Sequence, residues 1–385
     1  MTGVDATQHA ASASQPSYSR VVNVNPYTEA AKWNRQMLRK IGDTLKEDPE
    51  VDFTKLFTKR YAEKLKFLKE GPSARSSSQQ PSGPSFDRLD PRSGLEATDS
   101  TTILFEPTAD LQLLITTQNE LSTTLIDLLA EGSVLGKGPS MIVLQISDTI
   151  IVKVKLQDRF AIKEYHSLAY LQKNLPNFPA PKPHGLIHMG VFHLLFMSLV
   201  PGRTLEHIWP ELNDAQKQDI SCQIDDLLSS LRSLPPPSTP LGDVEGDGCI
   251  DRRRYPRANS EPILNSEQFR DFIFAGSRGT TVYNSLLREL LADPAGCVFT
   301  HGDIRPANIM MEADSGGRWR VSGIIDWETS GFYPEYWESV KMTNNLTHIE
   351  KCDWYNYLPQ SVSPRRYPTE WLVDRVLDAS MKNSF

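Results

Sequence analysis

Three polar residues in the C-terminal third of the chain lie beside apolar runs and have a spacing that can serve chemistry. Asp303 is followed five positions later by Asn308, and Asp326 ends the apolar run Ile324-Ile325 eighteen residues after Asn308. Carboxylate and amide oxygens suit Mg²⁺, a hard cation that prefers oxygen ligands. A further carboxylate can orient or deprotonate a hydroxyl that attacks a phosphate. The spacing therefore predicts a phosphoryl-transfer site in which Asp303 faces the acceptor, while Asn308 and Asp326 hold Mg²⁺.

Kinases share this pattern of D-x-x-x-x-N followed by an aspartate at a strand end. The segments HGDIRPANIMM (301–311) and GIIDWETSGFYPEYWE (323–338) resemble the aminoglycoside phosphotransferase-like branch of the protein-kinase-like fold. The PEYWE ending is most similar to the fungal small-molecule kinase-like members of that branch. The resemblance covers most of the chain from Leu121 to the C-terminus. The alternative interpretation is that Asp303 and Asp326 only cap a loop and end a strand.

The resemblance implies a bilobal protein-kinase-like fold of the α+β class, with a small β-rich N-lobe and a larger helical C-lobe. It implies ATP and Mg²⁺ as cofactors, with adenine bound to the hinge backbone from Ser198 to Val200. It also implies that His301 is a structural residue that bonds to backbone near Asp326, because a histidine at this place does not face the substrate.

Composition divides the chain before any motif is considered. Residues 1–20 are small, polar and aperiodic, and we expect them to be disordered. Residues 21–70 carry two amphipathic helical patterns. We expect them to form a helical N-terminal extension that docks on the main body or binds a protein partner. Residues 71–100 contain eight Ser, four Pro and three Gly, which predicts a flexible linker. A nucleotide-binding N-lobe is expected over 101–200, and a catalytic and acceptor-binding C-lobe over 201–385.

Hydrophobic periodicity predicts the elements within the two lobes. We expect strands at 133–135, 141–146, 149–154, 185–188 and 191–197, and helices at 121–131, 159–174, 215–234, 267–275 and 282–291.

Two glycines lie between the first two predicted strands. Gly136 and Gly138 match the start of G-x-G-x-x-G-x-V, with Val143 at the valine position, but Met141 replaces the third glycine. Glycines let backbone amides approach phosphates closely, so both are predicted to bind the nucleotide. The alternative is an ordinary turn.

Two lysines share one face of the strand at 149–154, because side chains repeat every two residues. Lys153 fits the V-A-I-K pattern best and is predicted to hold the α- and β-phosphates, with Lys155 left as the alternative. The lysine that is not used would be solvated at a strand edge. Glu164 lies on the apolar stripe of the helix at 159–174. A buried carboxylate needs a partner, so an ion pair with the strand lysine is expected.

The residues after the two motif aspartates indicate the acceptor. Arg305 follows Asp303 by two positions and either contacts the transferred phosphate or is an exposed loop arginine. Only seven residues separate Asp326 from Pro334-Glu335, where the next helix is expected. A protein kinase places a long activation segment there to hold a peptide. A small molecule with a hydroxyl or amino group is therefore the predicted acceptor.

The connection at 235–266 is rich in Pro and Gly and carries Asp251 followed by three arginines. It forms either a lid or acceptor-side wall, or a solvated loop.

Charge and cysteine usage exclude several classes of protein. The net charge of −7 argues against nucleic-acid binding, and the four cysteines are too widely spaced for a zinc site or a disulfide framework. We find no secretory signal and no apolar run long enough to cross a bilayer, so a cytoplasmic protein without a membrane partner is expected. A second hypothesis is a nucleotide-binding pseudoenzyme of kinase-like fold whose N-terminal helices recruit a partner.

Overall fold

The computed structural model describes residues 29–52, 57, 61, 65, 68, 90–116, 118–138, 141–156, 159–236, 241–246, 248–251, 257–258, 262–275, 277 and 279–382. The chain divides into two compact units, Met1–Ser82 with Phe385, and Gly83–Ser384. The disorder expected over 1–20 and the arginines at 252–254 fall outside the described residues.

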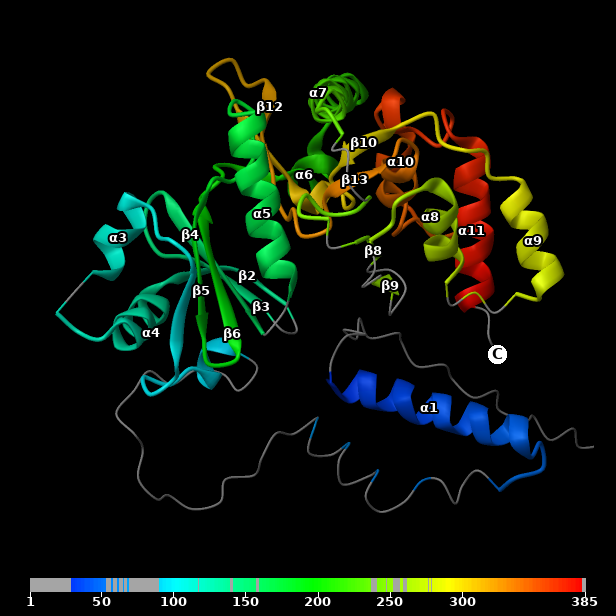
Figure 1. The fold of residues 1–385 in the computed structure, drawn as a ribbon, viewed down its shortest axis with the longest axis horizontal. Coiled ribbons are helices and arrows are strands. Elements are labelled where there is room, and N and C mark those ends of the chain that lie inside the picture. The colour runs from blue at the N-terminus through cyan, green and yellow to red at the C-terminus, as the bar shows by residue number, and fades with distance from the viewer. Residues whose placement is uncertain are drawn as a thin grey trace, which may run out of the picture. The chain divides into compact units, whose positions relative to one another are not determined.

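The first unit contains the long amphipathic helix α1 (Glu29–Glu47) (Figure 1). Trp33 on this helix stacks on Tyr61 with 6.2 Å between ring centroids, and the Tyr61 hydroxyl donates to Asn34 Oδ1 at 2.8 Å. The first helix predicted in the N-terminal extension therefore forms. Most of the second helical pattern lies outside the described residues.

The linker predicted over 71–100 ends earlier than composition suggested. Residues 71–89 lie outside the described residues, but Pro91–Gly94 form the 3₁₀ helix η2. Arg92 Nη1 donates to the Leu129 carbonyl at 3.0 Å, and the Ser122 hydroxyl donates to the Ala97 carbonyl at 2.7 Å. Leu129 and Ser122 both lie in a helix further along the chain. Residue composition alone therefore could not reveal that the segment at 91–97 packs against the N-lobe.

One antiparallel sheet of six strands, in the order β1-β5-β6-β4-β3-β2, forms the N-lobe (Figure 1). The strands are β1 (Thr101–Phe105), β2 (Ser133–Lys137), β3 (Met141–Gln145), β4 (Ile150–Leu156), β5 (Pro183–Met189) and β6 (Phe192–Ser198). Sequence periodicity predicted all of these except β1, whose side chains are mostly exposed. An exposed edge strand lacks the buried alternation that marks the others.

The two faces of this sheet bury different side chains. Val152 and Val154 of β4 pack in one core with Leu125 and Leu129 of α4 (Leu121–Glu131), alongside α3 (Ala109–Ile115). On the other face, residues such as Leu195 pack in a second core with α5 (Arg159–Asn174) and with the C-lobe. Lys153 pairs with Leu195 in the ladder and therefore points to this second face. Helices α4 and α5 begin and end at the predicted residues, whereas α3 was not predicted.

Short strands and helices make up the C-lobe. They are β7 (Arg203–Thr204), α6 (Leu205–Ile208), η3 (Trp209–Glu211), α7 (Asp214–Arg232), β8 (Ile250–Asp251), β9 (Arg257–Ala258), α8 (Ser266–Phe274), α9 (Thr281–Glu289), β10 (Cys297–Thr300), η4 (Pro306–Asn308), β11 (Ile309–Ala313), β12 (Trp319–Ile324), β13 (Gly331–Pro334), α10 (Trp337–Met342), η5 (Asp353–Asn356), η6 (Gln360–Val362) and α11 (Pro368–Lys382). The three predicted C-lobe helices correspond to α7, α8 and α9, with small shifts at their ends.

The prediction of a helix starting at Pro334-Glu335 was wrong. That stretch ends β13, which pairs antiparallel with β10, and α10 begins only at Trp337. All four β13 residues are buried, so pairing with β10 outweighs helix formation. The connection between Asp326 and β13 nevertheless spans only residues 327–330.

The connection at 235–266 is buried in part, so the solvated-loop alternative does not hold for all of it. Asp251 is 2% exposed and forms a 2.5 Å ion pair with Lys341 of α10. Together the β-sheet lobe and the mainly helical lobe form the bilobal α+β architecture that the sequence predicted. Among the described helices, none is long and apolar enough to cross a membrane.

Candidate active site

A pair of antiparallel strands brings the two motif loops together. Ile309 of β11 is paired with Ile324 of β12, and the Ile325 N–H donates to the Asn308 carbonyl at 2.9 Å. Asn308 immediately precedes β11, and Asp326 follows just after β12. The ladder therefore places the two predicted metal ligands at the same end of the strand pair.

Asp303 is joined to Asn308 within its own loop. The Asn308 side-chain amide donates to both the carbonyl and the Oδ2 of Asp303, each at 2.9 Å. Because an ionised carboxylate only accepts hydrogen bonds, the nitrogen of the Asn308 amide must face Asp303. The Oδ1 of Asn308 is then the atom that can ligate a cation.

Burial raises the pKa of Asp303, and the Arg305 charge opposes this shift. Arg305 Nε donates to Asp303 Oδ2 at 3.1 Å, and the arginine side chain is 41% exposed. A carboxylate with a raised pKa is a better proton acceptor for an incoming hydroxyl. The structure thus pairs Arg305 with Asp303. The contact of Arg305 with the transferred phosphate stays a prediction.

His301 links the two loops through both ring nitrogens. Its Nδ1 accepts from the Asp303 N–H at 3.1 Å, so Nε2 carries the proton and donates to the Ile325 carbonyl at 3.1 Å. Burial lowers the pKa of His301 to about 4. A neutral, fully buried ring in this position is a structural residue, and its predicted bond to backbone beside Asp326 is confirmed.

Asp326 is the one residue other than glycine with positive φ (71°) in the described part of the chain. Aspartate tolerates this left-handed conformation better than most residues. Its Oδ1 accepts from Lys153 Nζ at 2.5 Å. Burial acts to raise the pKa of Asp326, but the charge and hydrogen bond of Lys153 lower it to about 2. The carboxylate is therefore ionised throughout the physiological range.

Lys153 makes the predicted ion pair with Glu164. Its Nζ donates to Glu164 Oε1 at 3.1 Å and Oε2 at 2.9 Å, and both side chains are buried. Burial acts to lower the pKa of Lys153, but the charges of Glu164 and Asp326 outweigh it and raise the pKa. Because Lys153 joins Glu164 of α5 to Asp326, it is the better candidate for phosphate binding.

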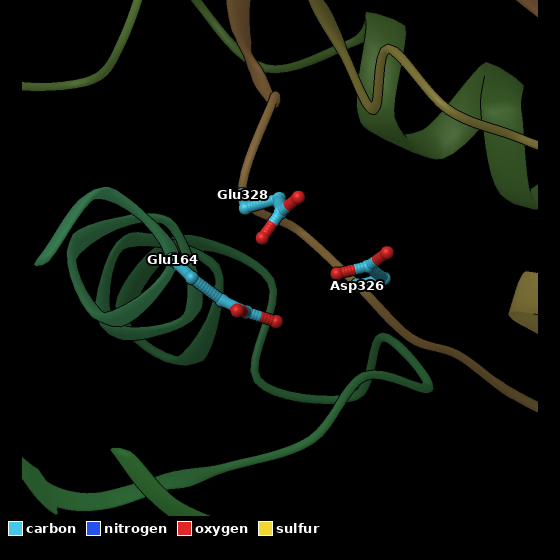
Figure 2. A group of neighbouring side chains, drawn as sticks. All are labelled: Glu164, Asp326 and Glu328. Carbon is cyan, nitrogen blue, oxygen red and sulfur yellow. The ribbon is translucent and has the colours of Figure 1, made fainter. Parts of the chain in front are cut away.

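The expectation that the second lysine is solvated was wrong. Lys155 is buried, and its Nζ donates to Glu328 Oε2. Glu328 also lies 3.9 Å from Lys153 Nζ. Figure 2 shows Glu164 projecting from a helix toward the segment that carries Asp326 and Glu328, and the three carboxylates lie within 4.8 Å of one another. Glu328 was not among the residues predicted from the sequence, although its position two residues after Asp326 was a usable signal.

A second residue missed from the sequence holds the loop of Asp303 in place. Glu338 of α10 accepts from the His301 N–H at 2.7 Å and from the Gly302 N–H at 3.2 Å. Burial raises the pKa of Glu338 to about 7, against the two backbone bonds, which lower it. Only a long-range contact identifies this role, because a glutamate at the start of a helix is common in sequence.

The position of Gly136 relative to the strands differs from the prediction. Strand β2 continues through Lys137, so Gly136 lies within the strand and only Gly138 follows it. The Gly138 N–H donates to the Met141 carbonyl at 2.9 Å, which closes the turn. A Cβ placed on Gly136 would meet nothing within 4 Å, so the space above it is open. Phosphate binding by these two glycines stays a prediction.

The hinge follows β6. The Ser198 N–H donates to the Lys182 carbonyl at 2.9 Å, and the Leu199 N–H donates to Thr149 at 2.8 Å. These two donors are engaged, which leaves Val200 as the N–H donor among the predicted hinge residues. A Cβ on Gly323 of β12 would lie 2.5 Å from Val200 Cγ1, so the hinge packs directly on this glycine. Adenine binding at Ser198 and Val200 stays a prediction.

The donor set fits magnesium. Asn308 Oδ1 and the carboxylates of Asp326 and Glu328 are oxygen ligands of the kind that Mg²⁺ takes. The His301 ring is not available as a ligand, because its proton is on Nε2 and its Nδ1 already accepts from backbone.

A model of the phosphotransferase enzyme family (APH) matches residues 145–370, more than half of the chain. The chain is similar to a complex of APH(2″)-IIa with streptomycin and ATP, with 13% identity over 69% of this chain and 88% of that chain and a TM-score of 0.43. It is also similar to a thermostable APH(4)-Ia mutant bound to AMP-PNP and hygromycin B, with 16% identity over 67% and 86% and a TM-score of 0.42. No curated protein matches the chain.

Proposed function

The chain belongs to the phosphotransferase enzyme family, and we propose that it transfers the γ-phosphoryl group of ATP, with Mg²⁺, to a hydroxyl or amino group of a small molecule. One observation carries the proposal. Lys153 Nζ bonds Glu164 and Asp326 at once, so a lysine suited to phosphates and an acid suited to a metal meet at one point. The lysine, the helix glutamate and the loop aspartate are therefore already paired, as in kinases, without a bound ligand.

The N-lobe residues bind and orient the nucleotide. Lys153, fixed by Glu164, contacts the α- and β-phosphates, and Gly136 and Gly138 approach the phosphates from β2 and the turn after it. Adenine bonds to the hinge at Ser198 and Val200. Positioning of this kind supplies much of the rate enhancement in phosphoryl transfer, because little covalent chemistry is left to the protein.

Asn308, Asp326 and the nearby Glu328 are the residues that hold magnesium. When bound, the ion neutralises negative charge on the β- and γ-phosphates. Lys153 already keeps Asp326 ionised, since it lowers the pKa of that carboxyl to about 2. Asp326 is thus charged at any physiological pH.

Asp303 acts on the acceptor. The acceptor oxygen or nitrogen attacks the γ-phosphorus, the bond to the oxygen bridging the β- and γ-phosphates breaks, and ADP leaves. The acceptor proton goes to Asp303, whose pKa is raised by burial. Arg305, bonded to Asp303 Oδ2, lies two residues away and can stabilise charge on the transferred group.

The short connection after Asp326 supports a small acceptor. Residues 327–330 lead directly into the buried strand β13, which leaves no long segment to hold a peptide. The PEYWE ending supports a place in the fungal small-molecule kinase-like branch, and we propose that the protein acts in the cytoplasm.

Nucleotide binding and turnover test the proposal separately. Thermal melting of the purified protein should rise with ATP, and more with ATP and Mg²⁺. ADP release should then depend on an acceptor chosen from a panel of hydroxyl and amino compounds. Binding without release across the panel would favour a pseudoenzyme. No melting shift with nucleotide would remove both hypotheses.

A further inference from the structure

A segment between α7 and α8 contacts both β13 and α5. This strap comprises residues Leu241–Asp251, of which all but 247 are described. Gly242 exchanges two backbone bonds with Phe332 of β13, at 2.8 and 2.6 Å. The Leu241 N–H also donates to Ile263 at 2.7 Å. The strap is therefore joined to the strand that follows the Asp326 loop.

Glycines make this crossing very close. A Cβ on Gly331 would lie 2.1 Å from the Gly242 carbonyl oxygen, and a Cβ on Gly242 would lie 2.3 Å from the Gly248 carbonyl oxygen. Gly242 also has φ of 118°, which favours glycine. Neither position accepts a side chain without backbone movement, so the strap needs glycine at both positions to pack against β13.

The residue after Gly242 reaches the N-lobe. Asp243 accepts a hydrogen bond from Lys163 Nζ, and the two side chains are 5% and 7% exposed. Lys163 immediately precedes Glu164 on α5. Neighbouring residues on a helix point about 100° apart, so the two side chains anchor α5 in different directions. Glu164 fixes it to Lys153 of the sheet, and Lys163 fixes it to the strap.

We propose that Asp243 is a positioning residue that holds α5 so that Glu164 stays in reach of Lys153. Rotation or withdrawal of α5 breaks a buried ion pair, which is strongly disfavoured when one charge is left alone. The same strap bonds β13, so the position of α5 is tied to the loop that carries Asp326. The proposal rests on the proposed function, since it concerns how the phosphate-binding lysine is held.

The structure supplies a matched control within the same strap. Asp251 forms a second buried ion pair from this segment, with Lys341 of α10 and not with α5. Substitution at Asp251 removes a buried ion pair of the same type from the same strap. Loss of stability alone would therefore affect both variants.

The test compares Asp243→Asn with Asp251→Asn by calorimetric titration with Mg²⁺ and AMP-PNP, and by the KM for ATP. We expect Asp243→Asn to weaken nucleotide binding and raise KM roughly 10-fold or more. Asp251→Asn should melt at a lower temperature but bind nucleotide as the unmodified protein does. Exchange of the charges, Lys163→Asp with Asp243→Lys, should restore much of the affinity.

Should Asp243→Asn fail to fold, the double variant Lys163→Met with Asp243→Asn removes both charges and leaves none unpaired. It should show the same weakened binding. Unchanged nucleotide affinity in the folded Asp243 variants would overturn the positioning role. If the unmodified protein itself binds no nucleotide, the proposed function fails instead.

Discussion

Lys153 and Asp326 are 173 residues apart in the chain, yet the lysine Nζ lies 2.5 Å from the aspartate Oδ1. This bond crosses from the β-sheet lobe to the loop after β12. The same lysine bonds Glu164 on α5, so three elements meet at one ammonium group. Four predictions follow from this site and the residues that hold it.

Lys153→Met should weaken ATP binding and lower kcat/KM by roughly 10²-fold, because the residue bridges the helix and the metal-binding loop. Lys155→Met is the matched control, since Lys155 lies on the same strand face and donates to Glu328. Its effect on ATP affinity should be much smaller. Titration with a fluorescent ATP analogue and steady-state kinetics would check both. Equal effects of the two variants would contradict the assignment of Lys153.

Asp303→Ala should lower turnover by roughly 10²-fold or more with little change in ATP binding, since the residue acts on the acceptor proton. Asp303→Asn keeps the shape but removes the base, and should be similarly slow. Turnover with the best acceptor and calorimetric binding of AMP-PNP measure the two quantities separately. Turnover at the level of the unmodified protein would remove the role given to Asp303.

Glu338→Gln should change how stability depends on pH. The pKa of Glu338 is raised from 4.5 to about 7, so the folded state binds a proton more readily than the unfolded state in this window. Glu338 therefore contributes stability below about pH 4.5 that is lost as pH rises to about 7, by roughly 3 kcal/mol. His301 acts in the opposite sense, because its lowered pKa makes stability rise with pH between about 4 and 6.5.

The variant isolates the Glu338 contribution. Urea unfolding at pH 5 and pH 8 should show that the unmodified protein loses stability relative to Glu338→Gln as pH rises. A constant difference between the two proteins would contradict the raised pKa. Slower turnover is also expected from Glu338→Gln, because the carboxylate that it removes accepts hydrogen bonds from two backbone amides of the loop that carries Asp303.

Gly323→Ala should perturb the hinge. The added methyl group would lie 2.5 Å from Val200 Cγ1 and 3.3 Å from the Pro179 carbonyl, so the backbone or Val200 must shift. We expect a loss of about 1–3 kcal/mol in stability and a higher KM for ATP. Gly296→Ala, where the methyl group would meet nothing within 4 Å, is the control. Denaturant unfolding and ATP kinetics on both variants measure the difference.

Local patterns were sufficient for several features. The limits of α4 and α5 were predicted to the residue because each has an apolar stripe at helical spacing and a break at both ends. The spacing of Asp303, Asn308 and Asp326 also indicated their grouping, since short loops beside paired strands leave few arrangements. Strand β1 and helix α3 were missed because their packing depends on the sheet they join.

The amino-acid order by itself determined which residues are available for phosphoryl transfer and roughly where the strands and helices lie. Only the tertiary structure decided which lysine joins Asp326, that Lys155 is buried against Glu328, and that Glu338 and Asp243 hold the site from elsewhere. Such pairings join side chains many positions apart, 80 in the case of Lys163 and Asp243. Whether a buried charge finds its partner depends on the path of the whole chain, which no local pattern contains.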